Sequence, residues 1–156
     1  MSQAREQVLG FLNAIYARDV ARALTFLDDE FDFVGHVPVE IFPHLGARHG
    51  KAEIAETLAA VQKRYTSMHH EVLFIAADDN RVATIVRVHL RKRSNDRMIE
   101  FLSADFYTLR NGLIIEQREF LDSFDLVQQV LEREVIEDIR ANIRARLTLA
   151  PAEPAE

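Results

Sequence analysis

The chain contains no cysteine, and this absence restricts the chemistry that it could perform. Disulfide bonds, thiolate nucleophiles and cysteine-based zinc or iron–sulfur sites are excluded. Any reaction would therefore use carboxylates, histidine, arginine, tyrosine or the hydroxyl groups of serine and threonine. The absence leaves open whether the protein works in a reducing or an oxidising compartment.

Long apolar runs and an excess of positive charge are also absent. No stretch approaches the roughly 18 apolar residues that span a membrane, and the polar N-terminus, MSQAREQ, lacks the apolar segment of a signal peptide. We therefore expect a soluble cytoplasmic protein with no membrane partner. The formal net charge is −6, so the surface repels phosphate groups overall and no nucleic-acid partner is expected.

The 156 residues, of which 48% are hydrophobic, are enough for one domain with a well-formed core. Apolar residues recur at helical spacing in three N-terminal segments and alternate along most of the later ones. The expected elements, in chain order, are a helix ending near Arg18, a shorter helix capped by Asp19, a short strand over 31–35, a loop over 36–50, a helix over 51–65, strands over 70–77, 81–91, 98–110 and 113–122, and a helical pattern from beyond Asp125 to about Leu147.

Helices followed by strands joined through short turns indicate an α+β fold, with an antiparallel sheet and helices collected on one of its faces. We expect a single domain over residues 1–148 and a disordered tail over 149–156. The loop over 36–50 is the best candidate for a lid over a cavity.

Ionisable residues lie within the later strands or at their ends. A sheet that buries one face tolerates such residues only when they are paired or functional, because an unpaired buried charge is costly. Strand alternation places Arg87 and His89 together on one face, and Asp105 and Tyr107 together on one face of the next strand. We expect these side chains to line a pocket.

The opposite face of the sheet would then carry Val86, Val88, Leu90 and their apolar neighbours. An exposed apolar face of this kind commonly marks an oligomer interface. The pattern therefore predicts a homodimer formed through the sheet.

Three segments carry a resemblance to a known superfamily: FLNAIYARDVARALTFLDDEFDFVG, HGKAEIAETL and DFYTLRNGLIIEQREFLD. They resemble the opening helices and first strand, the start of the third helix, and the last hairpin of nuclear-transport-factor-2-like proteins. This superfamily includes ketosteroid isomerase, SnoaL-like polyketide cyclases, limonene epoxide hydrolase and scytalone dehydratase. The resemblance covers roughly residues 5 to 130 and implies a cone-shaped α+β fold with a curved, mostly antiparallel sheet, followed here by a long C-terminal helix.

The resemblance also implies positions for catalytic groups. Limonene epoxide hydrolase activates a water with an Arg-x-Asp on a middle strand and an Asp that ends the last strand, which correspond here to Arg87, His89 and Asp122. Histidine in place of the middle acid can still accept a proton near neutral pH. Steroid isomerase activity is not expected, because Phe11 stands where that enzyme has a tyrosine and Val34 lies near the position of its base; only Asp105 matches its oxyanion-stabilising acid.

Together these features predict a SnoaL-like enzyme that performs acid/base chemistry without a cofactor on a small apolar or polycyclic molecule. The reaction would be of hydrolase, cyclase, dehydratase or isomerase type. No metal site is expected, because His69 and His70 would point to opposite faces of a strand. The residues expected to act in catalysis are His89, Asp122, Arg87 and Asp105, and those expected to contact the ligand are His36, Phe33, Tyr107, Arg118, Phe120 and Tyr16.

Two alternatives stay open at this point. Arg87 and Asp122 could form a buried ion pair with a hydrogen-bonded His89, kept for structure and not for catalysis. The whole chain could also be a non-catalytic ligand-binding or dimerisation module of the same fold. The long C-terminal helix favours this second alternative, since it could pack across a dimer or a partner.

Overall fold

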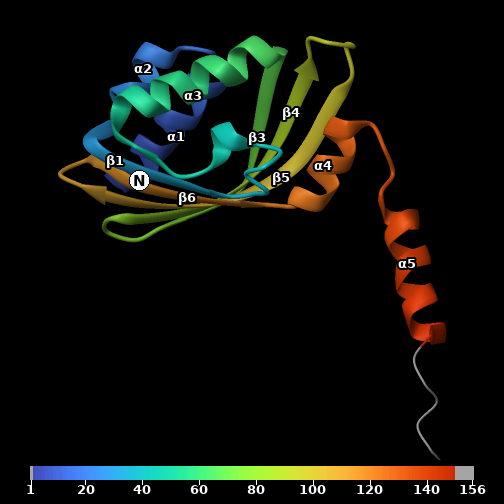
Figure 1. The fold of residues 1–156 in the computed structure, drawn as a ribbon. Coiled ribbons are helices and arrows are strands. Elements are labelled where there is room, and N and C mark those ends of the chain that lie inside the picture. The colour runs from blue at the N-terminus through green and yellow to red at the C-terminus, as the bar shows by residue number, and fades with distance from the viewer. Residues whose placement is uncertain (1, 150–156) are drawn as a thin grey trace, which may run out of the picture.

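A curved six-stranded sheet wraps around the N-terminal helices (Figure 1). The structure is a computed structural model and describes residues 2–149. The sheet order is β2-β1-β6-β5-β4-β3, and every neighbouring pair is antiparallel except β1 and β6, which run parallel. The strands are β1 Leu27–His36, β2 Arg48–His49, β3 Tyr65–Ala77, β4 Arg81–Lys92, β5 Met98–Arg110 and β6 Leu113–Leu121.

Helices α1 (Gln3–Tyr16) and α3 (Gly50–Arg64) lie on the concave side of the sheet, with the short α2 (Val20–Leu24) beside them (Figure 1). Asp19 caps α2 as the sequence predicts, because its Oδ1 accepts a hydrogen bond of 2.9 Å from the Arg22 amide. The order of helices and strands and the pairing of the sheet confirm the predicted α+β class and the mostly antiparallel sheet.

The core lies between these helices and the concave face. On β4, the residues Val82, Thr84, Val86, Val88 and Leu90 point inward and are buried. Burying such side chains against a helix layer stabilises the fold by roughly 1.5–3 kcal/mol for each large apolar group. The apolar series of β4 therefore faces the helices, and the intervening residues face outward.

A β-bulge sets which residues of β6 point inward. Leu109 pairs with Ile114 but Thr108 pairs with Glu116, so Ile115 is an extra residue on β6. One extra residue reverses the alternation along the rest of the strand. Ile114 is fully buried, and beyond the bulge it is the odd-numbered residues that face the concave side.

The loop between β1 and α3 is fastened to the sheet. It contains the short 3-10 helix η1 (Pro43–Leu45). A Cβ atom at Gly35 would collide with the Leu45 carbonyl oxygen, so only glycine allows β1 and this loop to approach so closely. Arg48 joins the same loop to α3 through a 3.2 Å hydrogen bond to Thr57 and binds the Pro43 carbonyl at 2.7 Å.

The C-terminal helical pattern forms two helices where the apolar spacing predicts one. Helix α4 (Ser123–Leu131) ends at Glu132, which adopts a left-handed conformation with φ 56° and ψ 33°, and α5 (Ile136–Leu149) follows. Lys92 holds this break, because its Nζ lies 2.6 Å from Glu132 Oε1 and 3.2 Å from the Val130 carbonyl oxygen. The spacing of apolar residues continues across the break and so does not reveal it.

Helix α5 points away from the rest of the molecule (Figure 1). Its side chains Ile136, Ile139, Ile143 and Leu147 are between 38% and 71% exposed and recur at helical spacing. None of the helices described is long and apolar enough to cross a membrane. The tail predicted over 149–156 lies outside the described residues except for Leu149, which ends α5.

Candidate functional site

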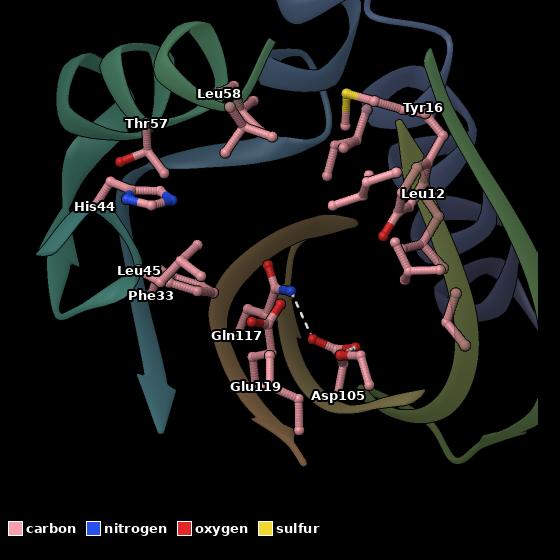
Figure 2. Close-up of a pocket in the computed structure, with 18 of the residues that line it drawn as sticks. Leu12, Tyr16, Phe33, His44, Leu45, Thr57, Leu58, Asp105, Gln117 and Glu119 are labelled. Atoms are coloured by element: carbon pink, nitrogen blue, oxygen red, sulfur yellow. Dashed lines mark hydrogen bonds between the residues drawn. The ribbon is translucent and has the colours of Figure 1, made fainter. Parts of the chain in front are cut away.

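A cavity lies between the concave face of the sheet and the helices and loop that cover it (Figure 2). Its volume is about 140 Å³, close to that of an engineered apolar cavity of ~150 Å³ that binds benzene. The wall is mostly apolar and aromatic. Its polar lining groups come from Tyr16, His44, Thr57, Tyr65, Ser103, Asp105, Gln117 and Glu119.

Two carboxyl groups face this cavity from neighbouring strands. Asp105 of β5 and Glu119 of β6 are directly opposite each other in the antiparallel register. Asp105 is buried and accepts hydrogen bonds from Ser103 Oγ at 2.7 Å and from Gln117 Nε2 at 2.9 Å. Glu119 keeps part of its surface accessible, and that surface lines the cavity. Asp105 is therefore held by two hydrogen bonds from neighbouring side chains, whereas Glu119 is only partly buried.

Burial raises the pKa of both carboxyl groups, since an ionised carboxylate is poorly solvated in an apolar cavity. Hydrogen bonds from Ser103 and Gln117 oppose this effect at Asp105, whose pKa rises to about 6. At Glu119 the charge of Asp105 adds to the burial, and the pKa rises to about 8. Near neutral pH the pair therefore shares one negative charge and one proton, and the hydrogen bonds from Ser103 and Gln117 favour the charge on Asp105.

Two tyrosines, Tyr16 and Tyr107, lie near the pair, and their hydroxyl groups remain protonated. Burial, followed by the charges of Glu119 and Asp105, raises the pKa of the Tyr16 hydroxyl well above its usual value. Burial and Asp105 do the same for Tyr107, whose hydroxyl lies 3.4 Å from Gln117 Nε2. The site thus combines a carboxylate, a carboxylic acid and neutral hydroxyl groups within an apolar enclosure.

Some of the residues predicted from the sequence lie at this cavity. Asp105, Phe33 and Tyr16 line it. Tyr107 is buried beside Asp105 but is not part of the cavity wall. Asp105 and Tyr107 both lie on the concave face of β5, so the prediction that they share a face is confirmed.

The prediction that Arg87 and His89 line the pocket is wrong. Both lie on the outer face of β4, because the apolar series of that strand faces the helices. Arg87 pairs there with Glu71 at 3.1 Å and with Glu100 at 3.6 Å, and His89 Nδ1 lies 3.5 Å from Glu100. The structure also replaces the predicted Arg87–Asp122 ion pair with these outer-face contacts.

Arg118, Phe120 and His36, which the sequence predicts as ligand contacts, also lie outside this cavity. The bulge at Ile115 turns Arg118 and Phe120 outward, where Phe120 stacks on His36 with ring centroids 4.1 Å apart. Asp122 lies one residue beyond β6 and caps α4, accepting a 3.1 Å hydrogen bond from the Asp125 amide. Its carboxyl group therefore serves the helix terminus and not the cavity.

The polar lining groups that are absent from the predicted site residues are Ser103, Gln117, Glu119, His44, Thr57 and Tyr65. Ser103 shares the parity of Asp105, so strand alternation alone could have identified it. Gln117 and Glu119 depend on the bulge, and His44 depends on how the loop folds over the sheet. Within residues 2–149, no group of three or more His, Asp or Glu side chains is arranged to hold a metal ion.

A family model for the SnoaL-like domain matches residues 8–117, more than two thirds of the chain. A candidate isomerase from Rhodopseudomonas palustris is similar in structure, with 27% identity, a TM-score of 0.74, and coverage of 85% of this chain and 98% of that one. No curated protein matches the sequence.

Two more distant structures share the fold. A candidate SnoaL-like polyketide cyclase from Jannaschia sp. CCS1 has 15% identity and a TM-score of 0.69, with 81% of this chain and 90% of that one covered. AclR, a candidate hydroxylase from Streptomyces galilaeus, has 13% identity and a TM-score of 0.71, with 93% and 94% covered.

The raised pKa of Glu119 predicts how stability depends on pH. The folded chain keeps this proton up to about pH 8, whereas the unfolded chain releases it near pH ~4, so this contribution is complete below pH ~4 and is lost as the pH rises through the folded pKa. We expect the free energy of unfolding, measured by urea denaturation, to fall by about 1 kcal/mol between pH 7 and pH 9.

The substitution Glu119→Gln should remove this fall, because the amide does not titrate. Glu116→Gln, which removes a carboxylate from the outer side of the same strand, is the matched control and should leave the fall in place. A Glu119→Gln protein that loses stability between pH 7 and pH 9 as steeply as the wild type would contradict the assignment.

Proposed function

The chain belongs to the SnoaL-like domain family, and we propose that it is an enzyme that moves protons on a small apolar ligand held in the cavity. The observation that carries the proposal is the pairing of Asp105 and Glu119 on one cavity wall. A base that is ionised and an acid that is protonated at the same pH are the two groups that acid/base catalysis requires.

The simplest reaction for this pair is proton transfer next to a carbonyl group. Asp105 takes a proton from the carbon beside the carbonyl, while Glu119 gives its proton to the carbonyl oxygen and an enol forms. Glu119 then takes the hydroxyl proton back as Asp105 returns its proton to a carbon of the enol. Where the substrate has a carbon–carbon double bond next to the deprotonated carbon, the intermediate is a dienol, and return of the proton to its far end shifts the double bond and gives an isomer. Both carboxyl groups regain their starting state, and no further reactant is needed.

The cavity supports a compact substrate. Its volume of about 140 Å³ suits a molecule of one or two rings better than a larger polycyclic one. Aromatic lining residues, among them Phe11, Phe31, Phe33 and Phe101, favour a ring system over a linear chain. The similarity to a candidate isomerase favours the isomerase type among the reaction classes that the sequence suggests.

A second feature, on the outer face of the sheet, supports a homodimer. Phe74, Ile85, Leu102, Phe106 and Phe120, which we call the outer patch, are between 39% and 52% exposed. They share one face across four strands, and the rings of Phe106 and Phe120 pack edge to face at 5.9 Å. An exposed apolar patch of this kind commonly marks an oligomer interface.

Charges beside the outer patch are already paired within the chain. Arg87 is paired with Glu71 and Glu100, and Arg118 Nε lies 2.7 Å from Glu116. A second copy could therefore cover the patch without leaving an unpaired charge at the interface, which is costly where water is excluded. We propose a second copy of this chain as the occupant.

Proton transfer can be measured without knowing the natural substrate. In D₂O, wild-type protein should catalyse exchange of the acidic CH₂ protons of 2-tetralone, a two-ring ketone, as followed by ¹H NMR. Asp105→Asn and Glu119→Gln should each lower the catalysed rate by about 10²-fold or more. His89→Ala and Asp122→Asn, which change residues outside the cavity, should leave it within about twofold of wild type and serve as controls.

An exchange rate no higher than that of buffer, across 2-tetralone and other small cyclic ketones, would contradict the proposed function. Equal activity in wild type and Asp105→Asn would contradict the role of the pair. Melting temperatures of all variants should be recorded, because loss of folding would also lower the rate.

The rate should depend on pH in a bell shape with its maximum near pH 7. Asp105 must be ionised, which gives a rising limb near pH 6, and Glu119 must be protonated, which gives a falling limb near pH 8. Ser103→Ala removes a hydrogen bond that lowers the pKa of Asp105, so the rising limb should move to higher pH while the falling limb stays. A flat profile between pH 5 and pH 9 would refute the assignment of acid and base.

The oligomeric state can be tested by light scattering at micromolar concentration. Wild type should have twice the chain mass of 17.9 kDa, and Phe106→Asp, which places a charge in the outer patch, should have the mass of one chain. Val39→Asp is the matched control, because Val39 is 47% exposed but lies in the loop outside the patch. A wild-type mass of one chain would rule out the dimer.

A further inference from the structure

His44 lies across the cavity from the carboxyl pair. It belongs to η1, in the loop that Gly35 and Arg48 hold against the sheet, and Figure 2 shows its ring beside Thr57 on one side of the pocket, apart from Asp105 and Glu119 on the strands. The ring also borders a shallow crevice on the outside, lined by Arg48, Glu53 and Thr57. His44 is therefore part of the wall that separates the cavity from this crevice.

One ring nitrogen of His44 is left without a partner. Its Nδ1 is buried and makes no hydrogen bond within the part of the chain that the structure describes. The nearest aromatic neighbour, Phe42, packs edge to face at 6.5 Å and offers no polar atom. A buried polar atom without a partner costs about 1–3 kcal/mol, so such atoms are rare and usually have a function.

The charge state of His44 limits what it can bind. Burial, followed by the positive charges of Arg64 and Arg48, lowers the pKa of His44 to about 4. The ring is therefore neutral at pH 7, with one nitrogen that donates and one that accepts a hydrogen bond. A neutral ring in an apolar wall suits an uncharged hydroxyl or carbonyl group and gives no compensation for the burial of an anion.

We infer that the cavity binds a ring compound with oxygen functions at two separated ends, one at Asp105 and Glu119 and the other, an uncharged hydroxyl or carbonyl, hydrogen-bonded to His44. This inference rests on the proposed function for the first end and adds the second. His44 makes the cavity selective, because a compound with a single oxygen function leaves one of the two polar walls unsatisfied.

Binding of naphthols tests the two ends separately. The probes are 2-naphthol, which has one hydroxyl, and the 1,5-, 2,6- and 2,7-naphthalenediols, which place a second hydroxyl at different separations. Affinities are measured by fluorescence titration at pH 7. At least one diol should bind wild type about tenfold more tightly than 2-naphthol, the gain from one additional hydrogen bond.

His44→Phe keeps an aromatic ring of similar size and removes both nitrogens. It should bind the diols and 2-naphthol with equal affinity, and its affinity for 2-naphthol should match that of wild type. Asp105→Asn and Glu119→Gln are the complementary variants. They should weaken 2-naphthol and the diols alike, and the preference for the best diol should remain.

The ¹⁵N resonances of the His44 ring provide a measurement on the unsubstituted protein. They should shift when the best diol binds, with no comparable shift on binding of 2-naphthol. No preference for any diol in wild type, or a preference that survives in His44→Phe, would overturn the role of His44 while leaving the proposed function intact. Failure of every naphthol to bind, or binding unaffected by Asp105→Asn and Glu119→Gln, would overturn the proposed function and this inference with it.

Discussion

The cost of ionising two neighbouring carboxyl groups in one apolar cavity governs the chemistry of this site. Asp105 and Glu119 are opposite each other across two strands, and both face a largely apolar enclosure. Ser103 and Gln117 donate hydrogen bonds to only one of the pair. The charge is therefore directed to Asp105 and the proton to Glu119, so that two chemically similar side chains take opposite roles.

The two faces of the sheet divide the charged residues by environment. On the concave face neutral donors bind the Asp105 carboxylate, and burial raises the pKa of both carboxyl groups. On the outer face Arg87 pairs with Glu71 and Glu100 in partial contact with solvent. Exposed pairs of this kind contribute little to stability, whereas burial on the concave face raises the pKa of the inner carboxyl groups.

Much of the fold could be predicted from the sequence, because apolar spacing is a property of each segment alone. The strand over 98–110, the cap at Asp19 and the shared face of Asp105 and Tyr107 follow from spacing and capping chemistry. The side of the sheet taken by Arg87 does not, because an alternating strand shows which residues share a face but not which face meets the helices. The bulge at Ile115 and the left-handed turn at Glu132 arise from pairing between distant segments, and each leaves the local apolar pattern unbroken. His44 reaches the cavity only through the folded loop, and no spacing rule could have placed it there.

Helix α5 has 14 residues and extends away from the sheet (Figure 1). A helix of this length is near the midpoint of its helix–coil equilibrium in water, since the cost of nucleation is barely recovered over so few hydrogen bonds. The ion pair between Arg140 and Glu137 at 2.9 Å adds only ~0.2–0.5 kcal/mol. The helical content of this segment therefore depends on whether Ile139, Ile143 and Leu147 are covered. A measurement of helicity in α5 would report directly on the surroundings of the protein and not on the integrity of the part that holds the cavity.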